Sequence, residues 1–378
     1  MTASRRSRIL IVDDSAVMRS LLRTVVSTDA GLEVAGTAAD GESALHAVES
    51  LRPDLVLLDV EMPVMDGLVT LKKLRARGLK VPVIMCSSLT QRGARVTIEA
   101  LASGASDYVA KPRNQAGRDA AIEALAQELI PKLHALARSS QNAQPSAAPP
   151  PRPGAAPLLP FPPARPQPLP SDPPVVLAIG VSTGGPAALD LFLPALPAGF
   201  PLPVLIVQHM PEVFTRLFAE RLNTRCRLAV REAEEGDAVN PGTIYIARGN
   251  WHLEVTVPAR RGAAHTLHLT QAPLENHCRP AVDVLFRSVA AVYASGVLAI
   301  ILTGMGSDGL AGCRVIRDRG GCVFAQDQAS SVIWGMPGAV ANAGLAHKVL
   351  PLTQIVPEIL RLAAKTPSEA SRLRESAV

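Results

Sequence analysis

Three residues that lie far apart in the chain could together perform nucleophilic catalysis. Ser182 lies in the string GVSTGG, His209 in VQHMP and Asp308 in TGMGSDG. A serine hydroxyl at its ordinary pKa is a weak nucleophile, so it needs a base within hydrogen-bonding reach and a carboxylate that orients the base. We therefore predict a catalytic site with Ser182 as nucleophile, His209 as base and Asp308 as the orienting acid.

The sequence around Ser182 predicts a strand, a sharp turn and a helix. Val175 to Ile179 is a run of apolar β-formers, Gly180 to Gly184 reads Gly-x-Ser-x-Gly, and Pro186 suits the first turn of a helix. A turn of this kind pushes the serine hydroxyl beyond the sheet. The alternative is a glycine-rich turn that holds a phosphate at the helix N-terminus, and the string alone leaves both interpretations open.

His209 and Asp308 each follow an apolar run, Val204–Val207 and Leu298–Leu302 respectively. Taken singly, His209 could be bonded to backbone at a strand end, and Asp308 could be the N-cap of a helix over Gly309–Asp318. The carboxyl ends of parallel strands share one edge of a sheet, which is where such folds bind ligands. Their joint position therefore favours the catalytic interpretation.

The chain order Ser, His, Asp differs from the order Ser, Asp, His of α/β-hydrolases, so we expect a convergent triad on another fold. An oxyanion would be held by backbone N–H groups. We expect these to come from Thr183, directly after the nucleophile, and from the glycine-rich loop at Met305 and Gly306.

A second cluster of polar residues follows the apolar runs in the first third of the chain. Asp13, Asp14 and Asp59 are carboxylates predicted at strand ends, and a lone Asp-Asp pair could instead cap a helix. Converging carboxylates repel one another unless a cation neutralises them, and oxygen ligands favour Mg²⁺. Ser87 and Lys111 add a hydroxyl and an ammonium, which would suit a phosphoryl group carried on a carboxylate.

Alternating strand and helix patterns must position both clusters. Five predicted strands alternate with five predicted helices in the first third, so we expect a doubly wound, flavodoxin-like parallel sheet. The fifth helix is expected over Ala116–Arg138 with a kink at Pro131. The alternation resumes at Val175 and predicts a Rossmann-like parallel-sheet hydrolase domain. Its first helix is expected over Pro186–Leu196, and His252 is expected on a surface turn of a hairpin.

We predict domains at residues 7–128 and 175–363, joined by a Pro/Ala-rich linker at residues 139–174. The linker interpretation rests on fourteen prolines between Pro145 and Pro174 with few charges, a composition that cannot bury a core. A PxxP ligand for an SH3-like partner is the functional alternative to a plain spacer.

Composition narrows the class of protein. The 378 residues are 48% hydrophobic and only 3% aromatic, which favours α/β layers built from small aliphatic side chains. The net charge of +5 is spread along the chain without base-stacking aromatics, so we expect no nucleic-acid partner. The 5 cysteines show no metal or disulfide spacing, which fits a cytoplasmic protein. Without an apolar run of 18 residues, we expect no membrane insertion.

Residues 7–128 resemble a response-regulator receiver domain in the strings VDDS, LLDVEMPVMDG, MCSS and ASDYVAKP. The resemblance implies that Asp59 accepts a phosphoryl group from a histidine kinase of the chemotaxis pathway. It implies an Mg²⁺ site made by Asp13, Asp14, Asp59 and the backbone carbonyl of Glu61. It also implies a switch pair, Ser87 and Tyr108, and a lysine that pairs with the phosphoryl group, Lys111.

Residues 175–363 resemble the chemotaxis protein-glutamate methylesterases and glutamine deamidases in the strings GVSTGGP, VQHMP, IYIARGNWHL, RPAVDVLF, ILTGMGSDG and SSVIWGMPGAV. The resemblance implies hydrolysis of glutamate γ-methyl esters on the cytoplasmic helices of chemoreceptors, and deamidation of receptor glutamines, without a cofactor. It assigns the same roles to Ser182, His209 and Asp308. Cys278 and Ala281 depart from the family, which commonly has histidine and serine there, and we expect these changes to affect substrate binding.

A receiver in front of a hydrolase suggests control by occlusion. We hypothesise that the unphosphorylated receiver covers the Ser182 cleft and that phosphorylation of Asp59 shifts the population toward an open arrangement. Two other classes of protein are alternatives. One is a signalling module in which GVSTGG binds a nucleotide phosphate, and the other is a transcription factor. The first lacks an acidic residue about 20 positions beyond the loop, and the second lacks a helix-turn-helix pattern.

Overall fold

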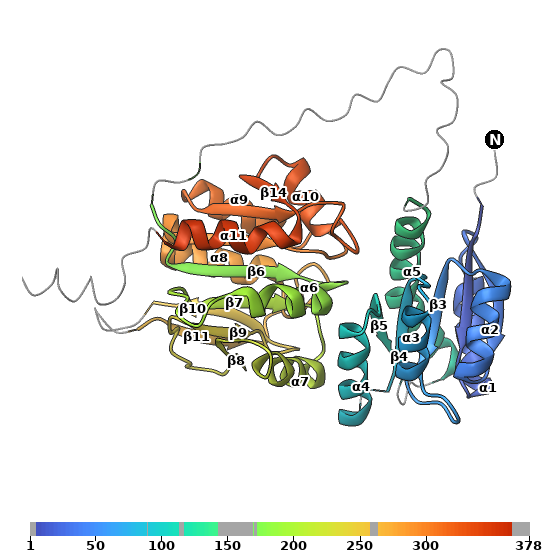
Figure 1. The fold of residues 1–378 in the computed structure, drawn as a ribbon. Coiled ribbons are helices and arrows are strands. Elements are labelled where there is room, and N and C mark those ends of the chain that lie inside the picture. Colours follow the sequence, from blue (N-terminus) through green and yellow to red (C-terminus); the bar gives the residue numbers. More distant parts are fainter. Residues whose placement is uncertain are drawn as a thin grey trace, which may run out of the picture. The chain divides into compact units, whose positions relative to one another are not determined.

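The computed structural model describes residues 5–88, 90–112, 117–142, 169, 172–257 and 264–364. The chain divides into two compact units, residues 1–155 and 156–378, and each is described by itself (Figure 1). Most of the predicted linker at residues 139–174 lies outside the described residues. No helix in the described ranges is long and apolar enough to cross a membrane.

The first unit is a five-stranded sheet in the order β2-β1-β3-β4-β5, and every strand pairs in parallel with its neighbours. Helix α1 packs on α5, whereas α2 packs on α3 and α3 on α4. This is the doubly wound receiver fold that the sequence predicts. The elements are β1 (Ser7–Val12), α1 (Ala16–Ser27), β2 (Leu32–Ala38), α2 (Gly41–Leu51), β3 (Leu55–Asp59), α3 (Gly67–Ala76), β4 (Val83–Ser87), α4 (Gln91–Ala102), β5 (Asp107–Ala110) and α5 (Arg118–Asn142).

The second unit holds a seven-stranded parallel sheet in the order β14-β13-β12-β6-β7-β9-β8, together with a separate antiparallel hairpin of β10 and β11. The predicted parallel α/β architecture is therefore confirmed. Its strands are β6 (Val176–Val181), β7 (Val204–Gln208), β8 (Ala229–Glu232), β9 (Thr243–Ile246), β10 (His252–Thr256), β11 (Thr266–Thr270), β12 (Val297–Ile301), β13 (Cys322–Gln326) and β14 (Lys348–Leu350).

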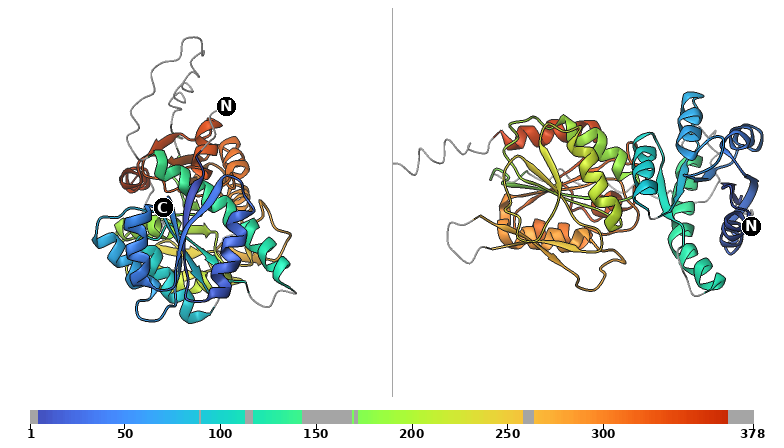
Figure 2. Two further views of the ribbon diagram at one scale, coloured as in Figure 1. Left: turned by 90° about the vertical axis from the view of Figure 1, so that its right-hand side faces the viewer. Right: turned by 90° about the horizontal axis from the view of Figure 1, so that it is seen from below.

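Helices cover both faces of this sheet, as Figure 2 shows. Helix α11 packs on α6, and on the other face α8 packs on α9 and α9 on α10. They are α6 (Gly185–Phe192), α7 (Glu212–Asn223), α8 (Val282–Tyr293), α9 (Leu310–Asp318), α10 (Met336–Asn342) and α11 (Leu352–Ala363), with short 3₁₀ turns η1 (Leu193–Ala195) and η2 (Ala294–Gly296).

Strands β6, β7 and β12 form the centre of the sheet and are fully buried along their length. Because helices cover both faces, these strands are continuous apolar runs instead of alternating ones. Their register aligns Val181 with Gln208 and Gly180 with Ile301. The residues that follow these three strands therefore emerge side by side at one edge of the sheet.

Two helix predictions differ from the structure in their bounds. The helix expected over Pro186–Leu196 ends at Phe192 and continues as the 3₁₀ turn η1. Pro194 lies in that turn, and a proline cannot donate the backbone hydrogen bond that would continue an α-helix. The helix expected over Ala116–Arg138 is α5, which spans Arg118–Asn142 and continues through Pro131.

The expectation that His252 lies on a surface turn is wrong. His252 is the first residue of β10 and its side chain is only 1% exposed. Its Nε2 lies 3.0 Å from the carbonyl oxygen of Pro273, and its Nδ1 accepts the backbone N–H of Ala281 at 3.2 Å. The imidazole thus joins the hairpin to the start of α8 through hydrogen bonds to two backbone groups. A sequence pattern does not reveal such bonds.

Val323 and Val349 offer a test of where the stability of the second unit lies. Val323 is fully buried in β13, whereas Val349 is 42% exposed in the adjacent edge strand β14. Val323→Ala should lower the free energy of unfolding by about 2 kcal/mol through lost methyl burial and a cavity. The control Val349→Ala should cost about 0.5 kcal/mol or less.

The measurement is urea unfolding followed by tryptophan fluorescence, since both tryptophans, Trp251 and Trp334, belong to this unit. Equal losses in the two variants would contradict the assignment of the core.

Candidate functional site

Ser182 occupies the turn between β6 and α6 at the carboxyl edge of the seven-stranded sheet. Its backbone N–H donates to the carbonyl of Thr303 at 3.0 Å, and its carbonyl accepts the N–H of Gly185 at 2.8 Å. Gly184 has a left-handed φ of 79°, and a Cβ there would lie 2.6 Å from Cβ of Val332. The turn therefore requires glycine at 184 for both conformation and space.

His209 and Asp308 form a direct pair. Nε2 of His209 lies 2.8 Å from Oδ2 of Asp308, whose side chain is 3% exposed. The same carboxylate accepts the backbone N–H groups of Val282 and Asp283 at 2.7 and 3.0 Å, and the side-chain amide of Asn276 at 2.9 Å. Burial alone would raise the pKa of Asp308, but these hydrogen bonds and His209 outweigh burial and hold the pKa below its ordinary value.

The bonds from Asp308 also explain how α8 begins. Its N-cap residue is Ala281, which has no side-chain acceptor for the first N–H groups of the helix. Asp308 supplies that acceptor from a distant loop, so a serine at 281 is not needed to cap the helix. The alternative prediction is that Asp308 is the N-cap of the helix that follows it. In the structure Gly309 is the N-cap of α9, and Asp308 accepts its N–H as well as the first N–H groups of α8.

The tautomer of His209 follows from its partners. Because a carboxylate accepts, Nε2 carries the proton in the neutral ring, which leaves Nδ1 as the basic nitrogen of that form. The Sγ of Cys278 lies 3.6 Å from this Nδ1. Burial lowers the pKa of His209, but the bond to Asp308 and the contact with Cys278 outweigh burial and raise the pKa to about 9.

The backbones of Ser182 and His209 are held together by a side chain that the sequence analysis missed. Gln208 is buried at the end of β7, and its amide donates to the carbonyls of Ser182 at 3.1 Å and of His209 at 3.3 Å. The signal in the sequence was a polar residue closing a fully apolar strand. Among the described residues, no hydrogen bond joins the Ser182 hydroxyl to the His209 ring.

The predicted oxyanion residues lie beside Ser182. A Cβ on Gly304 would come within 3.0 Å of Cβ of Ser182, so the loop after β12 touches the nucleophile. Within the part of the chain that the structure describes, the backbone N–H groups of Met305 and Gly306 donate no hydrogen bond. Thr183 is buried, and its carbonyl accepts the hydroxyl of Thr303 at 2.9 Å.

A tight turn at residues 275–278 brings Asn276 to the site. Asn276 and His277 both have left-handed φ values, 52° and 62°, and Glu275 pairs with Cys278 across the turn. The Asn276 amide donates 2.9 Å bonds to both Asp308 and Asp283. The sequence analysis missed Asn276, because an amide bridging two buried carboxylates has no local pattern.

Asp283 lies in the first turn of α8, is only 3% exposed and accepts the backbone N–H of Gly312 at 2.6 Å in α9. The indole N–H of Trp334 donates at 2.9 Å to the carbonyl of Gln326, which is the last residue of β13.

The first unit gathers its acidic residues at the carboxyl ends of β1 and β3. Oxygen atoms of Asp13, Asp14 and Asp59 lie within 4.8 Å of one another. Nζ of Lys111 lies 2.8 Å from Asp13 and 2.7 Å from Asp59. Burial raises the pKa of Asp59 to about 6, although Lys111 opposes this. Lys111 thus contacts two of the three carboxylates, and a set of hard oxygen donors with excess negative charge fits Mg²⁺.

The remaining residues predicted for this unit lie on neighbouring elements. Ser87 ends β4, is fully buried and donates to the carbonyl of Ser88 at 3.2 Å. Tyr108 lies buried in β5 with Nζ of Lys132 5.2 Å from its ring centre. Glu61 follows β3, and its backbone N–H donates to Asp59 at 3.4 Å.

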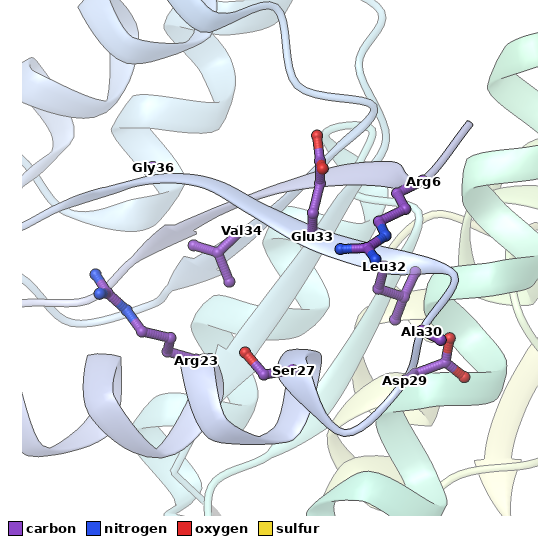
Figure 3. Close-up of a pocket in the computed structure, with 9 residues that line it drawn as sticks. All are labelled: Arg6, Arg23, Ser27, Asp29, Ala30, Leu32, Glu33, Val34 and Gly36. Atoms are coloured by element: carbon purple, nitrogen blue, oxygen red, sulfur yellow. The ribbon is translucent and has the colours of Figure 1, made fainter. Parts of the chain in front are cut away.

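A pocket of about 420 Å³ lies elsewhere on the first unit, beside the edge strand β2 (Figure 3). Side chains of both charges line it, among them Arg6, Arg23, Asp29 and Glu33. None of the predicted site residues borders this pocket, so it is separate from the acidic cluster.

Two protein families and several full-length proteins of known description are similar to this chain. Residues 177–359 match the CheB methylesterase family, and residues 9–123 match the response regulator receiver domain. A protein-glutamate methylesterase/protein-glutamine glutaminase from a Nocardioides species is 50% identical over 366 residues, which covers 96% of this chain and 97% of that protein. The chain belongs to the CheB methylesterase family.

One further full-length relative and one solved structure are also similar to this CheB family chain. The protein of the same description from Trichodesmium erythraeum is 47% identical over 366 residues, covering 94% of this chain and 98% of that protein. The crystal structure of the Thermotoga maritima CheB methylesterase catalytic domain is 41% identical with a TM-score of 0.49, covering 50% of this chain and 98% of that one.

The raised pKa of Asp59 predicts a pH-dependent stability of the receiver unit. Its folded pKa of about 6 lies above the ordinary carboxyl value of 3.8, so this group destabilises the fold increasingly as pH rises from about 4 to about 6. Asp59→Asn should therefore raise the melting temperature of the receiver unit above pH 6 and have little effect near pH 4.

Calorimetry from pH 4 to 8 in the presence of a chelator would measure this difference, since the chelator removes any cation that would neutralise the carboxylates. Melting temperatures of variant and wild type that run parallel at every pH would contradict the prediction.

Proposed function

We propose that this chain is a phosphorylation-regulated protein-glutamate methylesterase and protein-glutamine glutaminase of bacterial chemotaxis. It removes methyl groups from glutamate γ-methyl esters of chemoreceptors and deamidates receptor glutamines. Family membership and full-length relatives of this description support the activity. The observation that carries the site assignment is the His209–Asp308 pair at the edge of the sheet where Ser182 follows the adjacent strand.

In the proposed reaction, Oγ of Ser182 attacks the ester carbonyl carbon while Nδ1 of His209 takes the serine proton. Asp308 remains ionised and stabilises the imidazolium through Nε2. The imidazolium then gives its proton to the departing oxygen, and methanol leaves. Water, activated by the same imidazole, cleaves the acyl-enzyme and releases the glutamate side chain. A glutamine substrate follows the same path with ammonia as the leaving group.

The negative charge on the carbonyl oxygen needs donors that are already in place. We assign this role to the backbone N–H groups of Thr183, Met305 and Gly306. The contact between Gly304 and Ser182 supports the assignment, because it brings this loop next to the reacting serine. No cofactor takes part in these hydrolytic steps.

In the receiver unit, we assign Asp59 as the acceptor of a phosphoryl group from a histidine kinase. Lys111, which already contacts Asp59, would pair with the phosphoryl oxygens, and Ser87 and Tyr108 would respond to them. The residues that would hold Mg²⁺ are Asp13, Asp14, Asp59 and the backbone carbonyl of Glu61. When bound, the ion neutralises charge around the acceptor carboxylate during phosphoryl transfer. We propose a cytoplasmic location, because the receptor helices that the enzyme would act on are cytoplasmic.

Replacing the nucleophile tests the esterase assignment. Ser182→Ala should reduce methanol release from methylated receptor by at least about 10³-fold, because the acyl-enzyme cannot form. The matched control is Ser295→Ala, which removes a hydroxyl from η2 at the opposite end of β12 and should leave the rate near wild type. Equal rates for Ser182→Ala and wild type would refute the site assignment.

Removing the receiver tests the regulation. If the unphosphorylated receiver covers the Ser182 cleft, deletion of residues 1–140 should raise the rate of methanol release, and a phosphodonor should raise the rate of the full chain only. Asp59→Asn is the control, since it keeps the receiver but removes the acceptor and should not respond to the phosphodonor. A deletion variant no faster than the full chain would exclude occlusion.

A further inference from the structure

Cys278 stands in contact with the base of the proposed triad. Its Sγ lies 3.6 Å from Nδ1 of His209, the ring nitrogen that Asp308 does not occupy. Cys278 is only half-buried, so part of the residue is exposed to solvent. The geometry is that of a thiol, an imidazole and a carboxylate in series, with the serine as a neighbour.

The turn at residues 275–278 fixes the sulfur in this position. The backbones of Glu275 and Cys278 exchange two hydrogen bonds, of 3.1 and 2.9 Å. Asn276, inside the turn, donates to the same Asp308 that receives His209. The turn that carries the thiol and the imidazole are therefore both bonded to one carboxylate.

This contact gives the thiol a base. In the neutral form of His209, Nδ1 carries a lone pair and can take the proton of Cys278, and Asp308 stabilises the resulting imidazolium. A thiolate is the nucleophilic form of cysteine, and an adjacent imidazolium stabilises it.

The other four cysteines lack this arrangement. Cys86, Cys313 and Cys322 are buried, and burial raises the pKa of each thiol, to about 12 for Cys322. Cys226 is half-buried like Cys278, but burial raises its pKa to about 11. Among the described residues, Cys278 is the one cysteine whose sulfur contacts an imidazole, and Cys226 is its matched control.

We propose that Cys278 is a reactive thiol that electrophiles and peroxides modify selectively, and that its modification switches off the hydrolytic site through His209. The first half stands on the Cys278–His209–Asp308 geometry alone. The second half rests on the proposed esterase function.

The oxidation step is balanced with hydrogen peroxide as the oxidant. The thiolate sulfur forms a bond to one peroxide oxygen, the O–O bond breaks, and the leaving hydroxide takes the proton of the His209 imidazolium and departs as water. The sulfur loses two electrons to peroxide and becomes a sulfenic acid. A dithiol reverses the step, forming its own disulfide and water while the thiol returns.

The product would disable the esterase for a geometric reason. A sulfenic acid or an alkylated sulfur at Cys278 places additional atoms against Nδ1 of His209. Nδ1 is the nitrogen that must accept the proton of Ser182. Modification therefore removes the base without altering the nucleophile.

The first experiment measures labelling of the full-length protein with iodoacetamide at neutral pH, resolved by peptide mass spectrometry. Cys278 should be alkylated at least about 10-fold faster than Cys226, because the adjacent imidazole can accept the thiol proton as the sulfur attacks. His209→Gln should reduce the Cys278 rate to that of Cys226. The buried Cys313 should stay unlabelled in this variant, which shows that the fold is intact.

Equal labelling of Cys278 and Cys226 in wild type would overturn the proposal, and so would an unchanged Cys278 rate in a folded His209→Gln variant. If that variant exposes Cys313, and is therefore unfolded, the wild-type comparison decides alone.

The second experiment measures methanol release from methylated receptor after treatment with hydrogen peroxide. Wild type should lose activity and regain it with dithiothreitol, whereas the activity that Cys278→Ser retains should not respond to peroxide. Wild-type activity that resists peroxide, with Cys278 shown to be oxidised, would overturn the regulatory half. A protein with no esterase activity would refute the proposed function but leave the labelling result standing.

Discussion

The arrangement of the second unit depends on one buried carboxylate. Asp308 accepts hydrogen bonds from His209, Asn276 and the backbone N–H groups of Val282, Asp283 and Gly309. A buried charge without partners would cost several kcal/mol, so these donors are what allow Asp308 to remain ionised. By collecting them, the carboxylate joins the start of α8, the turn at residues 275–278 and the imidazole into one rigid assembly.

The parallel sheet supplies the second constraint. Strands β6, β7 and β12 are adjacent, and each ends at the same edge, so residues separated by long stretches of sequence meet there. Gln208 reinforces this meeting by bonding the backbones after β6 and β7. The fold brings the serine, the imidazole and the carboxylate to one edge of the sheet, and hydrogen bonds orient the imidazole and the carboxylate.

The acidic residues of the receiver unit have too few hydrogen-bond and charge partners, in contrast to Asp308. Asp308 has an excess of donors and a lowered pKa, whereas Asp59 shares a single lysine with Asp13 and has a raised pKa. The first arrangement is complete without a ligand. The second carries uncompensated negative charge, which is the condition under which a cation or a change at Asp59 can alter the local structure.

The sequence by itself determined the two parallel α/β folds and the positions of Ser182, His209 and Asp308 at strand ends, because apolar runs and glycine-rich turns are local signals. Only the tertiary structure decided how these residues are supported. The contact of Cys278 with His209, the bridge made by Asn276 and the burial of His252 join segments whose proximity no local pattern encodes. Their physical basis is hydrogen bonding between side chains and distant groups, which exists only after the chain has folded.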